Sequence, residues 1–153
     1  MANTYTQIHI HTVFAVQNRA SLIQKEWQER LYPYIIAIIQ NYGHKVLSIG
    51  GTSDHVHILF GFRPTQSLSE LMQNVKRNSS EWINKEKLVL GKFSWQEGFG
   101  AFSYSKSQIQ KVAKYIENQE KHHKKNTFIE EYKKILNDFE LEYNERYIFK
   151  SIE

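Results

Sequence analysis

The strongest chemical signal in the sequence is a pair of histidines separated by one residue. His55 and His57 stand in the segment DHVHILF, whose apolar residues are typical of a strand. Because side chains alternate along a strand, both imidazoles should point to one face, with Val56 on the opposite face. Two imidazoles in this register can bind one divalent cation. Satisfied or surface histidines produce the same pattern about as often, so both interpretations stay open.

A second pair with the same spacing, His9 and His11, lies near the N-terminus. The surrounding residues 6–15 alternate between apolar and polar side chains and predict a first strand. If this strand and the strand with His55 and His57 are neighbours in one sheet, both histidine pairs can border one site. The alternative for His9 and His11 is a packing or hydrogen-bonding role.

Further candidate side chains lie on a helix that we expect over residues 106–122. At about 100° per residue, Tyr115, Gln119 and His122 fall in a narrow sector beside the apolar stripe. An amide oxygen added to two imidazoles leaves positions open for a hard cation, Mg²⁺ or Mn²⁺, and for a phosphate oxygen. A phenol beside such a site can attack a metal-polarised phosphodiester. The alternative for Tyr115 is packing at the core boundary with its hydroxyl in water.

Residue types and spacing also exclude several kinds of site. Cysteine is absent, which excludes disulfides, thiolate nucleophiles, zinc ribbons and iron–sulfur centres. The sequence lacks the third alternating histidine of histidine-triad hydrolases, the H-E-x-x-H and H-x-H-x-D-H motifs, and the repeated His-x-Ser/Thr of two-histidine phosphoesterases. Any metal must therefore be held by histidines, carboxylates or amides.

The elements that position these side chains follow the order βαββαβ, with helices added at the C-terminus. We expect strands over residues 6–15, 45–50, 55–62 and 101–104, and helices over residues 22–41, 68–82, 106–122 and 127–143. Pro33 lies inside the first helix and should kink or shorten it. This order predicts an α+β, ferredoxin-like sandwich with an antiparallel sheet, the core that RNA-recognition domains share.

Length and composition indicate the number of domains, and net charge indicates which partners are possible. The 153 residues, 41% hydrophobic and 24% charged, predict one globular domain over residues 1–153. The net charge of +4 permits an anionic partner without requiring one. No secretory leader and no membrane-spanning run are visible, so we expect an unexported, cytoplasmic protein of bacterial type without membrane contact.

Several segments, in this order, resemble the single-tyrosine HUH transposases of the insertion-sequence-200-like kind. They are HTVF at residues 11–14, GTSDHVHILF at 51–60, LMQNVKRNSSEW at 71–82, FSWQEGFGAFS at 93–103 and KYIENQ at 114–119. The resemblance extends over about residues 5–132, with the separations that the family has. Segments in register over this length are far more specific than any one motif.

The resemblance implies a DNA transposase that cuts and rejoins single-stranded DNA at the hairpin-bearing ends of a mobile element. By the family pattern, His55 and His57 bind Mg²⁺ or Mn²⁺, Gln119 completes the metal site, and Tyr115 forms a 5′-phosphotyrosine link. No organic cofactor is implied. A homodimer is implied, with the site assembled either within one chain or across two.

Basic side chains are candidate DNA contacts, each with a solvated surface role as the alternative. They are Lys76 and Arg77 on the second long helix, Lys106 before the tyrosine helix, and His122 and Lys124 after it. His122 is also an alternative metal ligand, one turn beyond Gln119.

Other functions stay open beside the transposase. They are a domesticated protein that binds or nicks single-stranded DNA or hairpins, a replication initiator or relaxase, and a non-catalytic nucleic-acid-binding module. The short chain argues against initiators and relaxases, which carry long accessory regions. The RNA-binding string K/R-G-F/Y-G/A-F-V-x-F/Y is absent, which argues against the binding module.

Overall fold

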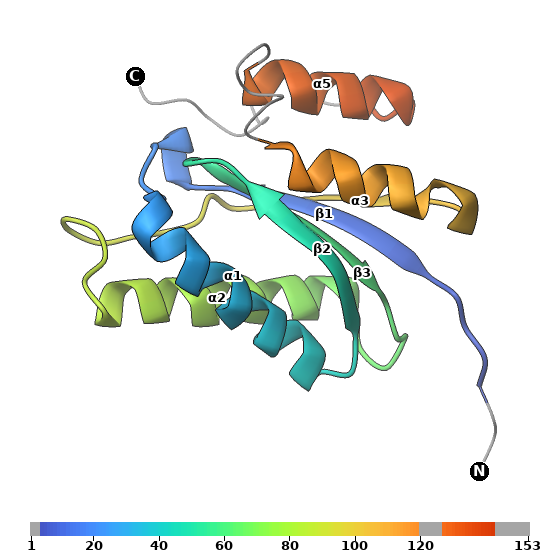
Figure 1. Cartoon of the computed structure of the whole chain (residues 1–153), viewed down its shortest axis with the longest axis horizontal. Helices are drawn as coiled ribbons and strands as arrows, with labels where there is room; N and C mark the ends of the chain where they lie inside the picture. The colour runs from blue at the N-terminus through green and yellow to red at the C-terminus, as the bar shows by residue number, and fades with distance from the viewer. Residues whose placement is uncertain (1–3, 120–126, 143–153) are drawn as a thin grey trace.

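A four-stranded antiparallel sheet lies at the centre of the computed structural model, which describes residues 4–119 and 127–142 (Figure 1). The strands are β1 (His9–Ala15), β2 (Lys45–Gly51), β3 (His55–Gly61) and β4 (Gly100–Ser103). Their order across the sheet is β2-β3-β1-β4, so the strand with the histidine pair is a neighbour of β1 in the centre. This topology confirms the predicted ferredoxin-like α+β fold.

Helices cover both faces of the sheet (Figure 1). On one face lie α1 (Lys25–Asn41) and α2 (Leu68–Lys85), and on the other lie α3 (Ile109–Glu117) and α5 (Phe128–Asp138). Among the described residues, no helix is both long enough and apolar enough to cross a membrane.

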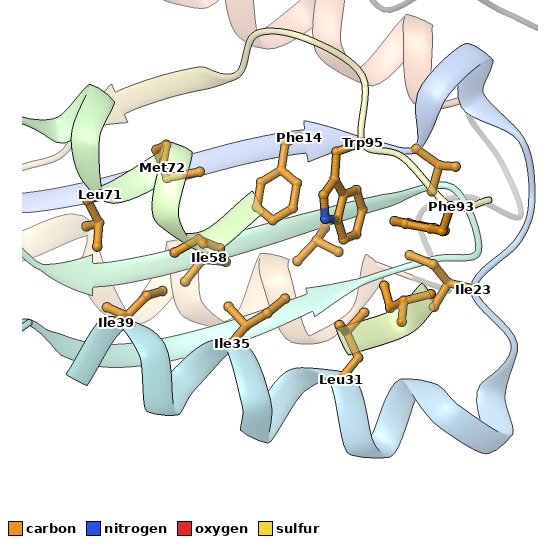
Figure 2. Packing of buried hydrophobic residues seen from close by; sticks show 14 of the residues in the cluster. Phe14, Ile23, Leu31, Ile35, Ile39, Ile58, Leu71, Met72, Phe93 and Trp95 are labelled. Carbon is orange, nitrogen blue, oxygen red and sulfur yellow. The ribbon is translucent and has the colours of Figure 1, made fainter. Parts of the chain in front are cut away.

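The main hydrophobic core lies between the sheet and helices α1 and α2 (Figure 2). Phe14 and Ile58 come from the two central strands and are completely buried against side chains of both helices, such as Ile35 and Met72. Burying a side chain of this size stabilises the fold by about 1.5–3 kcal/mol. Because strand side chains alternate, this core uses one face of β3 and leaves His55 and His57 on the other.

Small residues on β2 let α3 lie directly on the sheet. A Cβ at Gly50 would collide with the backbone carbonyl oxygen of Ile116, so glycine permits the close approach of strand and helix. Ser48, also on β2, donates a hydrogen bond of 3.1 Å from its Oγ to the carbonyl oxygen of Ala113, which lies about one helical turn before Ile116. These contacts place the second half of α3 over β2 and β3.

Pro33 lies inside α1, which runs unbroken from Lys25 to Asn41, so the expectation that Pro33 would shorten this helix is wrong. Pro33 and Glu29, four residues earlier, are both exposed. Water can therefore satisfy the Glu29 carbonyl that proline leaves without an amide donor. The buried stripe through Leu31 and Ile35 keeps the helix on the core.

Two other helices are shorter than the sequence pattern predicts. The segment expected as one helix over residues 106–122 begins as a 3-10 turn, Lys106–Gln108, and its α-helical part, α3, ends at Glu117. Residues 120–122 lie outside the described residues. The helix expected over 127–143 starts after Thr127, whose side chain accepts a hydrogen bond from the Glu130 amide, and ends at Asp138. A left-handed backbone at Glu140 prevents its continuation.

Candidate active site

The histidine pair lies at the start of β3, on the face of the sheet that α3 and α5 cover. Both His55 and His57 are completely buried, and their ring centroids are 5.0 Å apart. Their Nε2 atoms point to side chains that come from elements after the sheet, Gln119 and Glu131. The alternation of β3 therefore places both imidazoles on one face, as the sequence predicts.

Gln119 lies just beyond the end of α3 and is buried. Its Oε1 is 3.0 Å from His55 Nε2, and its Nε2 donates to the backbone carbonyl oxygen of Tyr115 at 3.4 Å. The structure thus brings together the amide and the imidazoles that the sequence proposes as metal ligands.

Tyr115 is partly buried on the last turns of α3. Its ring lies nearly perpendicular to that of His57, with 5.9 Å between the centroids, and its hydroxyl donates a hydrogen bond to Glu131 Oε2. Burial, followed by the negative charge of Glu131, raises the pKa of Tyr115 well above its usual value. The hydroxyl is therefore held as the neutral phenol in this arrangement.

Glu131 on α5 is the member of the cluster that the sequence interpretation missed. Its Oε1 lies 3.1 Å from His57 Nε2 and 3.8 Å from His55 Nε2. Together His55, His57 and Glu131 offer ligand atoms that all lie within 4.8 Å of one another. A signal was present in the sequence, because Glu131 occupies the apolar stripe of α5, between Phe128 and Tyr132.

Further side chains orient the two imidazoles. Asp54 Oδ1 lies 2.7 Å from His55 Nδ1 and also accepts a hydrogen bond of 2.9 Å from Thr52 Oγ1. A carboxylate at Nδ1 favours the tautomer with its proton there, which leaves the Nε2 lone pair directed toward Gln119. The Asp54 and Thr52 side chains thus orient the His55 ring so that its Nε2 faces Gln119.

His11 plays the corresponding part for His57. Its Nε2 is 2.7 Å from His57 Nδ1, and the Tyr104 hydroxyl lies 3.5 Å from its Nδ1. Burial first, and repulsion from His57 second, lower the pKa of His11, so this imidazole is neutral and can accept the His57 Nδ1 proton. His11 therefore borders the site through a hydrogen bond to His57. His9 pairs with Gly61 at the far end of β3 from His55 and so lies away from this cluster.

The predicted DNA contacts on α2 lie on the face of the sheet opposite α3 and α5. Lys76 Nζ donates to the carbonyl oxygens of Gln96 and Gly98, at 2.6 and 2.9 Å. It thereby tethers the loop before β4 and keeps one proton for any other partner. Arg77 is exposed and donates to Asn74 at 2.9 Å. His122 and Lys124 lie outside the described residues.

Lys106 lines a surface cavity of about 410 Å³ at the other end of the sheet. The cavity lies between the N-terminal segment, the end of β3 and the start of α3, and His9 and Arg63 also line it. The basic side chains of Lys106 and Arg63 thus line one cavity near the start of α3, whereas Tyr115 and Gln119 lie toward its opposite end.

The family described as "Transposase IS200 like" matches residues 4–119, and the chain belongs to this family. It is an enzyme of the tyrosine (Y1) transposase type, which carries out the DNA transposition of mobile elements. His55, His57, Tyr115 and Gln119 all lie inside the matched region. Glu131 lies beyond it.

Named relatives agree with this assignment. The chain is 25% identical over 119 residues to the ISDra2 transposase TnpA of Deinococcus radiodurans, covering 74% of this chain and 84% of that protein. A crystal structure of a candidate transposase from Deinococcus radiodurans R1 superposes with a TM-score of 0.63 at 19% identity, over 78% of this chain and 95% of the other. The structure of a REP-associated tyrosine transposase bound to a REP hairpin superposes with a TM-score of 0.56 at 14% identity, over 76% and 68% of the two chains. Both structures share the fold.

Proposed function

We propose that this transposase cuts and rejoins single-stranded DNA at the hairpin-bearing ends of a mobile element, with Tyr115 as the nucleophile. The observation that carries the proposal is the convergence of Tyr115, Gln119, His55 and His57 on one buried cluster. Gln119 Oε1 lies 3.0 Å from His55 Nε2, and the Tyr115 hydroxyl binds the same Glu131 carboxylate that contacts His57. A phenol is thus held beside a set of cation ligands.

The donor set fits Mg²⁺ or Mn²⁺. Two imidazole nitrogens with outer hydrogen bonds to Asp54 and His11, and one amide oxygen, are ligands that such cations accept. His55, His57 and Gln119 would hold the ion. When bound, a divalent cation polarises the scissile phosphate and stabilises the charge that develops on it. No organic cofactor is part of this proposal.

The covalent step conserves the phosphodiester bond energy. Tyr115 loses its proton, its oxygen bonds to phosphorus, and the bond from phosphorus to the 3′ oxygen breaks. The departing 3′ oxygen gains a proton, and the downstream strand stays attached through a 5′-phosphotyrosine ester. Attack of a 3′-OH on this ester reverses the chemistry and rejoins DNA. Because burial and Glu131 disfavour the phenolate, nearby positive charge must help Tyr115 to ionise.

The proposed partner is single-stranded DNA with hairpin ends, and the protein is proposed to act as a homodimer. The hairpin-bound relative supports a DNA hairpin as ligand. The cavity lined by Lys106, Arg63 and His9 supports a phosphate contact by Lys106.

A covalent-adduct assay tests this function. The protein is incubated with single-stranded oligonucleotides from the flanks of its own gene and Mg²⁺ or Mn²⁺, and protein–DNA bands are sought on a denaturing gel. We expect a band that requires metal and disappears in Tyr115→Phe and in His57→Ala. Tyr42→Phe is the matched control, because Tyr42 is 40% exposed just after the end of α1. Tight DNA binding without any band would instead favour a domesticated, binding-only protein.

A further inference from the structure

A buried carboxylate enters the site from α5, outside the part of the chain that matches the family. Glu131 is 9% exposed, and its two oxygens reach different partners. Oε1 faces the Nε2 atoms of His57 and His55, and Oε2 accepts the hydrogen bond from Tyr115. Buried glutamates are rare unless they are paired or coordinate a metal, so this placement needs a reason.

The proposed cation site lacks a negatively charged ligand without Glu131. Neutral imidazoles and an amide add no negative charge to a site for a divalent cation, whereas Mg²⁺ and Mn²⁺ prefer anionic oxygen ligands. Asp54 contacts the outer Nδ1 of His55, away from the Nε2 side. In the described part of the chain, the carboxylate that shares the Nε2 side with both histidines is that of Glu131.

The distances between the candidate ligand atoms can be compared with those around a small cation. Adjacent ligands of an octahedral ion with bonds of about 2.1 Å lie about 3.0 Å apart. The separation is 3.0 Å between His55 Nε2 and Gln119 Oε1, and 3.1 Å between His57 Nε2 and Glu131 Oε1. The third separation, from His55 Nε2 to Glu131 Oε1, is 3.8 Å. The separations of 3.0 and 3.1 Å match adjacent ligands of one small cation, and the separation of 3.8 Å lies between the adjacent spacing and the roughly 4.2 Å of opposite ligands.

We infer that Glu131 is the anionic ligand of the metal site, beside His55, His57 and Gln119. The inference rests on the proposed function, since it completes the same site. One carboxylate oxygen binds the ion and the other holds the Tyr115 hydroxyl, so α5 ties the nucleophile to the metal. The site then requires a helix that lies beyond the family match.

Manganese binding tests this inference without DNA. Free Mn²⁺ is titrated by electron paramagnetic resonance against the full chain and its variants. Glu131→Gln, which keeps the shape of the side chain, should weaken Mn²⁺ binding about tenfold or more. Glu130→Gln is the matched control, because it removes one negative charge from the exposed neighbouring residue and should bind as the wild type does.

Equal or tighter Mn²⁺ binding by Glu131→Gln would overturn the inference, since it would make Glu131 an ion-pair partner of the histidines or a competitor for the site. A second measurement does not depend on the folding of a variant. Electron–nuclear double resonance on wild-type protein labelled with ¹³C at glutamate carboxyl groups should show a strong carbon coupling to bound Mn²⁺. Absence of that coupling would likewise overturn it.

The two proposals fail separately. If Mn²⁺ affinity depends on Glu131 but no covalent DNA band forms, the ligand assignment stands and the tyrosine chemistry fails. If the band forms and requires Tyr115 while Glu131→Gln binds Mn²⁺ normally, the transposase mechanism stands and the ligand assignment fails.

Discussion

Replacing Gly50 by alanine should displace the tyrosine helix from the histidines. An added Cβ would lie 3.0 Å from the carbonyl carbon of Ile116, and closer still to its oxygen, both of which are backbone atoms that no rotamer change can move. Carbon atoms pack best at about 3.5–4.0 Å, so α3 must move outward by about 1 Å. Tyr115 adjoins Ile116 and moves with it.

The expected cost has two parts. Overpacking of this kind destabilises a protein by about 1–3 kcal/mol, which urea unfolding would measure. A displacement of about 1 Å at a reacting group can lower the rate about 100-fold, which the rate of covalent-adduct formation would measure. The rate should therefore fall even at temperatures where Gly50→Ala is fully folded.

Gly61→Ala is the matched control on the neighbouring strand. A Cβ at Gly61 would meet Lys45 atoms at 3.8 and 4.0 Å, which is ordinary contact. This variant should keep wild-type stability and rate. If Gly50→Ala did the same, the close packing of α3 on β2 would not position Tyr115, and the reasoning would be refuted.

Other predictions concern the surroundings of the site. His11→Ala removes the partner of His57 Nδ1 and should weaken Mn²⁺ binding about 10–100-fold; unchanged affinity in the same titration would contradict that role. Lys106→Ala should reduce the salt dependence of DNA binding by about one phosphate contact, measured by fluorescence anisotropy from low to high salt, and an unchanged slope would place the DNA elsewhere. Burial raises the pKa of Tyr132 to about 12, so the folded state keeps the phenol neutral while the unfolded chain ionises above about pH 10. Stability should fall between pH 10 and 12 more steeply in the wild type than in Tyr132→Phe, and equal slopes in urea unfolding would exclude this linkage.

Local patterns accounted for most of the fold. Alternation in residues 6–15 predicted β1, the apolar run at residues 55–62 predicted β3, and the apolar spacing from Leu68 predicted α2. The errors concern helix continuity and helix ends, which depend on packing against the rest of the protein as well as on local sequence. Pro33 stays helical because it is exposed on a helix that the core already holds. The expected helix over 106–122 ends early, at Glu117.

Part of the candidate site could also be predicted from local sequence patterns. His55 and His57 could be assigned to one face from sequence because a strand fixes the direction of alternate side chains within a few residues. Tyr115 and Gln119 could be grouped because they lie four residues apart. The prediction of a metal site at these residues stays a prediction that binding experiments must test.

Sequence alone therefore determined the order of the elements, the face of each strand and the residues that could do chemistry, because each depends on neighbours along the chain. Tertiary structure alone decided that His11 orients His57 and that Glu131 reaches both histidines and Tyr115. These contacts join residues 46, 74 and 16 positions apart. They depend on the register of β1 against β3 and on the docking of α5, which no local period encodes.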